Sequence, residues 1–156
     1  MGVQTYYSQQ SLIAAGNQKA QDKDIVSFYL FDTLLVRRVH DPDLVKLPVA
    51  RFVAALAGMK GISTGWQNVQ KLRDSIEQRQ RAETGKNYDD HEACYPQFME
   101  ELLRNIFNGK FSENLLQEVT RYELHMENSM LVPRKQFLNW SRELSGQGKR
   151  VFVISD

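Results

Sequence analysis

Two short apolar runs in this 156-residue chain each end in small polar side chains that suit anion binding. The first run, residues 25–31, is followed by Asp32 and Thr33, and the second run ends in Ser155 and Asp156. In open α/β sheets, ligands bind beyond the carboxyl ends of the strands, where loops and helix N-termini present backbone N–H groups to anions. We therefore expect Thr33 and Ser155 to lie at one anion-binding edge.

Arg37 and Arg38 follow the first run closely. Guanidinium groups bind phosphate or carboxylate bidentately, so this pair suits the entrance of a substrate site. Solvated arginines, or partners of acids elsewhere in the chain, are the alternative. Thr33 and Ser155 also suit helix caps, and capping is compatible with phosphate binding because both use the same geometry.

The apolar runs are too short for helices, and their continuity predicts strands buried on both faces at residues 25–31 and 151–154. Between them, apolar side chains recur at three- and four-residue steps, which predicts helices. The expected helices cover residues 47–59, 64–84, 92–107, 112–130 and 134–144. The polar N-terminal residues 1–23 predict a short helix or a loose arm.

Two buried strands with helices between them favour a parallel sheet, because parallel neighbours need a long crossover. The predicted fold class is α/β, and most of the crossover, about 120 residues long, is expected to form a separate helical cap.

Composition excludes several classes of function. Twenty basic and nineteen acidic side chains give a net charge of +1, so neither nucleic acid nor an anionic membrane surface is an expected partner. No segment approaches the roughly 20 apolar residues that a membrane-spanning helix needs. The single cysteine, Cys94, rules out an internal disulfide and fits a reducing compartment, so we expect a cytoplasmic protein.

The stretch "IVSFYLFDTLLVRR" resembles the first motif of the haloacid dehalogenase (HAD) superfamily of phosphohydrolases, in its bacterial branch with the form hydrophobic-S-F-D-x-F-D-T-L-L-x-R. "GKRVFVISD" is similar to the second motif, a strand ending in Ser or Thr, and "RQRAE" and "ELHMENSMLVPR" resemble the cap helices and the re-entry into the core. The resemblance, over about residues 24–156, implies a partial Rossmann-like parallel sheet with a large inserted helical cap. Its divisions are an N-terminal arm at 1–23, an incomplete core at 24–40 and 132–156, and a cap at 41–131.

In the family, an aspartate at the end of the first strand attacks phosphate with the help of Mg²⁺, and a later hydroxyl binds the phosphoryl oxygens. The resemblance places Thr33 at the threonine of the first motif and Ser155 at the phosphate-binding hydroxyl. It places Tyr29 at the nucleophile. Phe31 stands at the acid/base position, and Asp32, one place later, points differently and is a weaker candidate for proton transfer.

A phenol has an unperturbed pKa of about 10 and replaces a carboxylate neither as this nucleophile nor as a ligand of Mg²⁺. The prediction is a HAD-like module that is inactive as a phosphohydrolase and has no cofactor, with a residual phosphate pocket and a binding or assembly role. The alternative is the N-terminal part of an active Mg²⁺-dependent HAD-family phosphohydrolase acting on a small phosphorylated metabolite. For Tyr29 itself, a packing residue or a tyrosine nucleophile are the other interpretations.

The sequence stops directly after the second motif, and the lysine and acids of the later motifs have no counterpart in it. Two strands leave open hydrogen-bonding edges, so we expect the remaining core strands from a longer chain, a dimer mate or another protein. The expected ligand is a small phosphorylated molecule. "DDHEAC", residues 89–94, is interpreted first as a helix N-cap and only second as a metal site, so no metal ligands are predicted.

Overall fold

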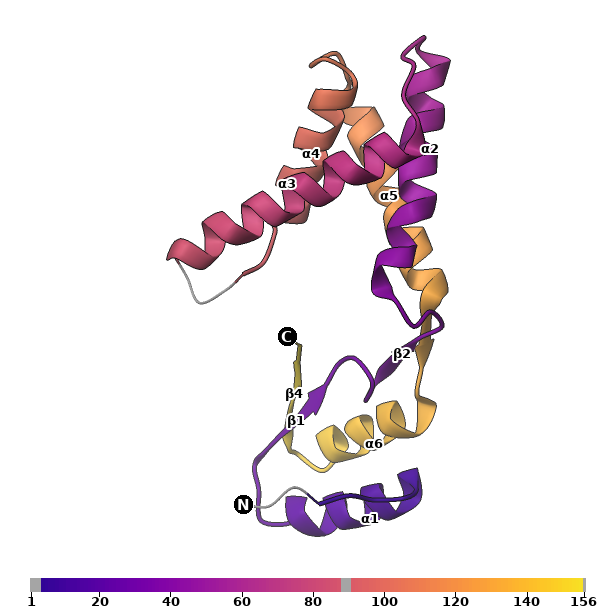
Figure 1. Ribbon diagram of the computed structural model, residues 1–156. Coiled ribbons are helices and arrows are strands. Elements are labelled where there is room, and N and C mark those ends of the chain that lie inside the picture. The colour runs from indigo at the N-terminus through magenta and orange to yellow at the C-terminus, as the bar shows by residue number, and fades with distance from the viewer. Residues whose placement is uncertain (1–3, 88–90, 156) are drawn as a thin grey trace. The chain divides into compact units, whose positions relative to one another are not determined.

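The computed structural model describes residues 4–87 and 91–155, and the described part is a mixed α/β structure (Figure 1). It contains six α-helices, one parallel pair of strands and one antiparallel pair. A wider Rossmann-like sheet is not present among these residues. The chain divides into two compact units: unit 1 comprises residues 1–40 and 131–156, and unit 2 comprises residues 41–130.

The parallel pair in unit 1 joins β1 (Ile25–Tyr29) and β4 (Arg150–Ile154), with Tyr29 aligned with Ile154. The parallel pairing predicted from the two apolar runs is therefore confirmed. β1 is shorter than the predicted strand, because the backbone turns at Asp32, which has a φ of 58°.

Unit 1 packs helix α6 (Lys135–Gly146) against one face of this pair, and α1 (Gln9–Ala20) packs on α6 (Figure 1). Val153, which is aligned with Phe28 on this face, stays 55% exposed. Phe28 of β1 meets Trp140 of α6 edge to face, with ring centroids 5.0 Å apart. The indole Nε1 of Trp140 donates a hydrogen bond to Oδ1 of Asn17 in α1 at 2.6 Å. Residues 9–20, for which the sequence left a helix and a loose arm open, thus form a helix attached to the core of unit 1.

The opposite face of the β1–β4 pair is exposed. Side chains alternate between the two faces of a strand, and Ile25, Phe152 and Ile154 are 49%, 51% and 49% exposed. The prediction that both strands are buried on both faces is wrong. The reason is that the buried cluster that α6 and α1 complete in unit 1 takes in only alternate strand residues, such as Phe28 and Val26.

The antiparallel pair joins β2 (Leu35–Arg37) and β3 (Leu131–Pro133), which the sequence did not predict. The backbone N–H of Arg134 extends this pair by donating to the carbonyl of Leu34 at 2.8 Å. The two strands carry the chain out of unit 1 toward residue 41 and back from residue 130.

Unit 2 is helical. Its elements are the 3₁₀ turn η1 (Pro42–Val45) and helices α2 (Lys46–Met59), α3 (Trp66–Asn87), α4 (Tyr95–Ile106) and α5 (Glu113–Met130). The four helices predicted in this region, and the one at α6, are confirmed. Val53, Met99 and Leu103 are fully buried in the core, and Phe52 stacks on Tyr122 with centroids 4.3 Å apart. In the part of the chain that the structure describes, no helix is long and apolar enough to cross a membrane.

Candidate functional site

The loop after β1 is a tight turn. The carbonyl of Leu30 accepts hydrogen bonds from the N–H groups of Leu34 at 3.0 Å and Leu35 at 2.9 Å, and the N–H of Asp32 donates to the carbonyl of Leu35 at 2.7 Å. Asp32 has the left-handed conformation, which is uncommon outside glycine and is tolerated best by Asn and Asp. This turn keeps Thr33 in the loop at the end of β1 instead of continuing the strand.

The structure brings Thr33 and Ser155 to the same edge of the parallel pair. Thr33 lies in the turn after β1, and Ser155 directly follows β4. The N–H of Leu30 donates to the carbonyl of Ile154 at 2.8 Å, which joins the start of the turn to the last residue of β4. Both hydroxyls therefore belong to the carboxyl-terminal edge, and their roles in binding phosphate stay predictions.

Tyr29 is the last residue of β1 and is half-buried. Its neighbour Phe28 faces the helices of unit 1, so alternation puts Tyr29 on the other face of the strand. Asp32 is exposed to solvent, and Asp156 lies outside the described residues.

The two arginines predicted at the substrate entrance differ in their surroundings. The guanidinium carbon of Arg37 lies 3.8 Å from the ring centroid of Phe31, in a cation–π contact that fixes the arginine beside the turn. Arg38 is exposed in the segment after β2. Of the pair, Arg37 is the one held in place.

The side chains at this edge do not fit a carboxylate-bound Mg²⁺. The described groups are the phenol of Tyr29, the hydroxyls of Thr33 and Ser155, and the exposed carboxylate of Asp32. Mg²⁺ in phosphoryl-transfer sites is held by one or two carboxylates in an octahedral set of oxygens, and a phenol does not replace the carboxylate at the strand end. Across residues 4–87 and 91–155, no three His, Cys, Asp or Glu side chains are grouped to hold a metal ion. Two residues of the "DDHEAC" stretch, 89 and 90, lie outside those ranges.

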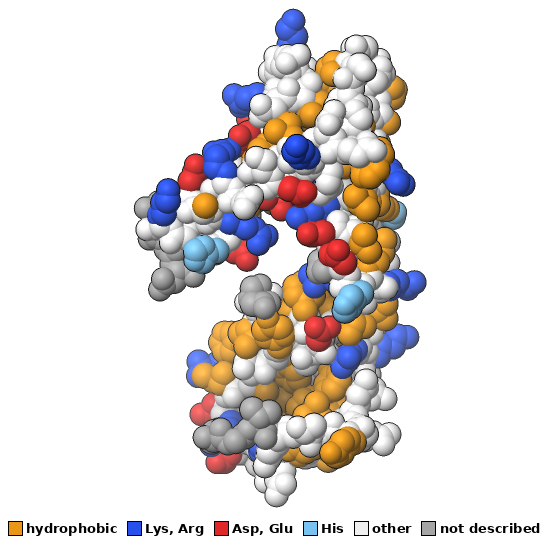
Figure 2. Space-filling model, viewed as in Figure 1, with side chains coloured by type: hydrophobic (Ala, Val, Ile, Leu, Met, Phe, Trp, Pro, Cys, Tyr) orange, Lys and Arg blue, Asp and Glu red, His pale blue; other side chains and the backbone are white. Residues whose placement is uncertain are grey.

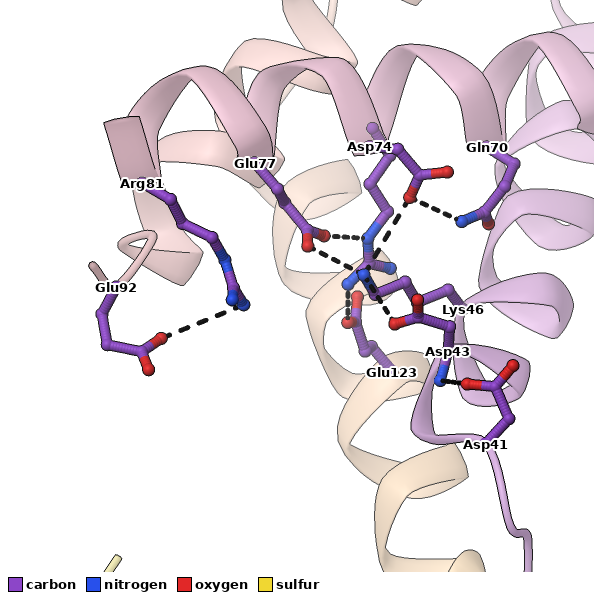
Figure 3. Close-up of polar contacts among 10 residues, drawn as sticks. Asp41, Asp43, Lys46, Gln70, Asp74, Glu77, Arg81, Glu92 and Glu123 are labelled. Atoms are coloured by element: carbon purple, nitrogen blue, oxygen red, sulfur yellow. Dashed lines mark hydrogen bonds and ion pairs between the residues drawn. The ribbon is translucent and has the colours of Figure 1, made fainter. Parts of the chain in front are cut away.

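A second polar cluster lies inside unit 2 and was not predicted (Figure 3). Arg73 of α3 donates from Nε to Glu77, one turn further along the same helix, at 2.6 Å, and from Nη2 to Glu123 of α5. These three residues are 4%, 6% and 6% exposed. Lys46, at the start of α2, donates to the second oxygen of Glu77 at 2.9 Å, and the hydroxyl of Tyr95 in α4 donates to Glu123 at 3.0 Å. Residues from all four helices of unit 2 therefore meet in one network.

The network shifts the pKa values of Glu77, Lys46 and Tyr95 in directions that keep their charged or donor forms at neutral pH. Burial alone would raise the pKa of Glu77, but the hydrogen bonds from Arg73 and Lys46 lower it below its usual value. Burial alone would lower the pKa of Lys46, but its bonds to Glu77 and Asp43 raise it. Burial and the adjacent charge of Glu123 raise the pKa of Tyr95, so its phenol stays a donor. Groups held in this way are suited to joining helices and not to proton transfer.

One polar atom in the network has no partner among the described residues. Nη1 of Arg73 is buried and makes no hydrogen bond there. An unpaired buried N–H costs free energy, so this atom offsets part of what the network contributes to stability. The other two nitrogens of the guanidinium are bonded to carboxylates, which leaves the group neutralised.

No protein-family model matches this chain, and no curated protein matches it. The relation to the HAD superfamily therefore rests on the two sequence motifs and is taken up below as a proposal.

Sequence reasoning found the strand-end residues but missed the network in unit 2. The spacing of Arg73 and Glu77, four residues apart on a helix, was a visible signal for an ion pair. Glu123 gave no such signal, because it lies on another helix 50 residues away.

Proposed function

We propose that this chain is a HAD-like module in which unit 1 supplies part of a Rossmann-like core with an anion pocket, and unit 2 is its helical cap. It acts by binding a phosphorylated ligand or by assembly, and not by hydrolysing phosphate esters. The observation that carries this proposal is the parallel pairing of β1 with β4, which puts Thr33 and Ser155 at one edge with Tyr29 at the end of β1.

The proposed pocket binds its ligand through neutral donors and one arginine. Hydroxyl groups donate hydrogen bonds to phosphoryl oxygens, which is the role proposed for Thr33 and Ser155. Arg37, stacked on Phe31, supplies a guanidinium whose planar fork suits two phosphoryl oxygens. The ligand class that fits this set is a small phosphate monoester.

Tyr29 is the reason for proposing binding without hydrolysis. A carboxylate at this position would attack phosphorus and would also bind Mg²⁺, and a phenol that is protonated at neutral pH does neither well. The single described carboxylate near this edge, Asp32, lies in the turn and is exposed.

A second candidate function is the N-terminal part of an active phosphohydrolase, and the exposed sheet face favours it. Ile25, Phe152 and Ile154 form an apolar surface of the kind that further core elements cover. Those elements are proposed to come from a longer chain, a dimer mate or another protein. A longer chain, unlike a dimer mate of the same sequence, would also bring in the residues of the later motifs.

Isothermal titration calorimetry with inorganic phosphate tests the pocket. The unchanged chain is expected to bind phosphate, and Thr33→Val and Ser155→Ala are each expected to weaken binding at least about tenfold, the value of one charge-assisted hydrogen bond. Ser145→Ala removes an exposed hydroxyl from α6 and is the matched control. Equal affinities in all four proteins, or no binding by the unchanged chain, would contradict the proposal.

Hydrolysis of an aryl phosphate in the presence of Mg²⁺ separates the two candidate functions. The unchanged chain is expected to release no phosphate. Turnover by the Tyr29→Asp variant alone would favour the second candidate, because it would show that the scaffold is competent once the carboxylate is restored. Turnover by the unchanged chain would refute the assignment of Tyr29 as a lost nucleophile.

A further inference from the structure

The chain enters unit 2 through η1, and this turn is tied to α3 by one cation. Nζ of Lys46 lies 2.9 Å from a carboxylate oxygen of Glu77, 3.0 Å from one of Asp43 and 3.9 Å from one of Asp74 (Figure 3). Asp43 belongs to η1, whereas Glu77 and Asp74 belong to α3. A single ammonium group thus joins the turn to a helix more than 30 positions further along the chain.

The turn has its own local bonds, and its second half is anchored by packing against α2 and α5. Oδ1 of Asp41 accepts a hydrogen bond from the N–H of Asp43 at 2.9 Å, and the carbonyl of Asp41 accepts one from Leu44 at 3.1 Å. Val45 is buried at the end of the turn, while Leu44 is 45% exposed. The first half of η1 therefore depends on polar contacts to stay on the helices.

The partner of Lys46 is itself immobilised. Glu77 is 6% exposed and is held from its other oxygen by Arg73, which also binds Glu123 of α5. A carboxylate fixed in this way gives Lys46 a defined position. The side chain of Asp43, on the turn, is 70% exposed, so its pair with Lys46 depends on the fixed position of the cation and not on burial of the carboxylate.

We propose that Lys46 is a clasp that makes the entry turn part of the rigid helical body of unit 2. The cation converts a short exposed turn into an extension of α2 that is fixed against α3. This inference concerns unit 2 alone and does not depend on the proposed anion pocket.

Backbone ¹⁵N relaxation of the full chain tests the clasp. The amides of Asp43 and Leu44 are expected to have order parameters near the value of about 0.85 for rigid backbone, and Lys46→Met is expected to lower them below about 0.6. The amides of the four helices are expected to keep their values. Arg79→Met is the matched control, because Arg79 lies on α3 and its loss breaks ion pairs to Glu83 of α3 and Glu101 of α4 without touching the turn.

A second variant tests the same contact from the other side. Asp43→Asn removes the negative charge on the turn and leaves the buried part of the network intact, and it is expected to lower the order parameter of Leu44 as well. If both variants leave the turn rigid, the clasp is refuted. If Lys46→Met loosens the four helices as much as the turn, Lys46 is a general stabiliser of unit 2, and the proposal of a local clasp is equally overturned.

Discussion

Replacing Arg73 with leucine is the most informative perturbation of unit 2. The variant leaves the carboxylates of Glu77 and Glu123, each 6% exposed, without the cation that they share. Removing one partner of a buried ion pair costs about 3–5 kcal/mol. Glu77 keeps Lys46 and Glu123 keeps the hydroxyl of Tyr95, so we expect a loss near the lower end, about 3 kcal/mol in the free energy of unfolding.

The two tryptophans make the measurement specific to one unit. Trp66 belongs to unit 2 and Trp140 to unit 1, and the sequence has no others. In a Trp140→Phe background, the fluorescence of Trp66 reports the unfolding of unit 2 in urea. The midpoint is expected to fall with an unchanged m-value, because the surface exposed on unfolding stays the same.

Two comparisons decide whether burial of the ion pairs is the cause of the stability that Arg73→Leu loses. Arg79→Leu removes a cation whose carboxylate partners Glu83 and Glu101 are more exposed, and it is expected to change the midpoint far less. Replacing Arg73, Glu77 and Glu123 together by leucine removes every buried charge of the triad and is expected to recover much of the lost stability. The reasoning is refuted if the Arg73 and Arg79 variants lose the same stability, or if the triple variant is as unstable as Arg73→Leu.

Three further outcomes are expected. Folding lowers the pKa of Glu77, so the stability that its carboxylate contributes is present above the usual pKa near 4.5 and is lost as the pH falls below that value. The urea midpoint of unit 2 is therefore expected to drop in acid. In Glu77→Gln, the drop is expected to be less steep. In unit 1, Gly16→Ala would put a methyl group against the ring of Trp140, so the free energy of unfolding of unit 1 is expected to fall by about 1–3 kcal/mol in urea titrations. Gly58→Ala, which meets nothing within 4 Å, is the control in α2 and is expected to raise the stability of unit 2 by up to about 1 kcal/mol. Lys149→Met removes hydrogen bonds to three carbonyls at and just after the end of α1, so mass-spectrometric hydrogen exchange is expected to quicken in α1 and not in α2.

The sequence predicted the parallel pair because each strand has a local apolar signal and the connection between the two strands is long. Residues 25–29 and 150–154 are mostly apolar or aromatic, with Ser27 and Arg150 as the exceptions, and the long helical segment between them leaves a parallel arrangement as the simplest connection. The exposure of one face of these strands was not predictable in the same way. An apolar residue such as Phe152 indicates a tendency to be buried, but the sequence does not say which element covers it. The end of β1 at Tyr29 was also not predictable, because the sequence does not distinguish an aspartate in a left-handed turn from an aspartate in another loop conformation.

The polar network of unit 2 shows a different limit of prediction from the sequence. Helical periodicity located α3 and α5, but it did not state which faces of the two helices meet. Arg73 and Glu123 come together only through the tertiary packing of unit 2, and a pattern of charges along one helix does not encode a partner on another. The short strands β2 and β3 escaped prediction because three residues carry too little periodicity.

The charges of the two polar clusters favour the strand-end edge as the place for an anionic ligand. In unit 2, each arginine and lysine of the network already binds buried or nearby carboxylates, so a phosphate group would have to compete with Glu77 and Glu123 for them. At the strand-end edge, the described groups are mostly neutral donors. Tyr29 puts a phenol at the end of β1, where a carboxylate would repel a bound phosphate group. In the HAD-like module proposed above, Tyr29 at the nucleophile position also avoids this repulsion, which is why we propose that this edge retains binding of an anion without its hydrolysis.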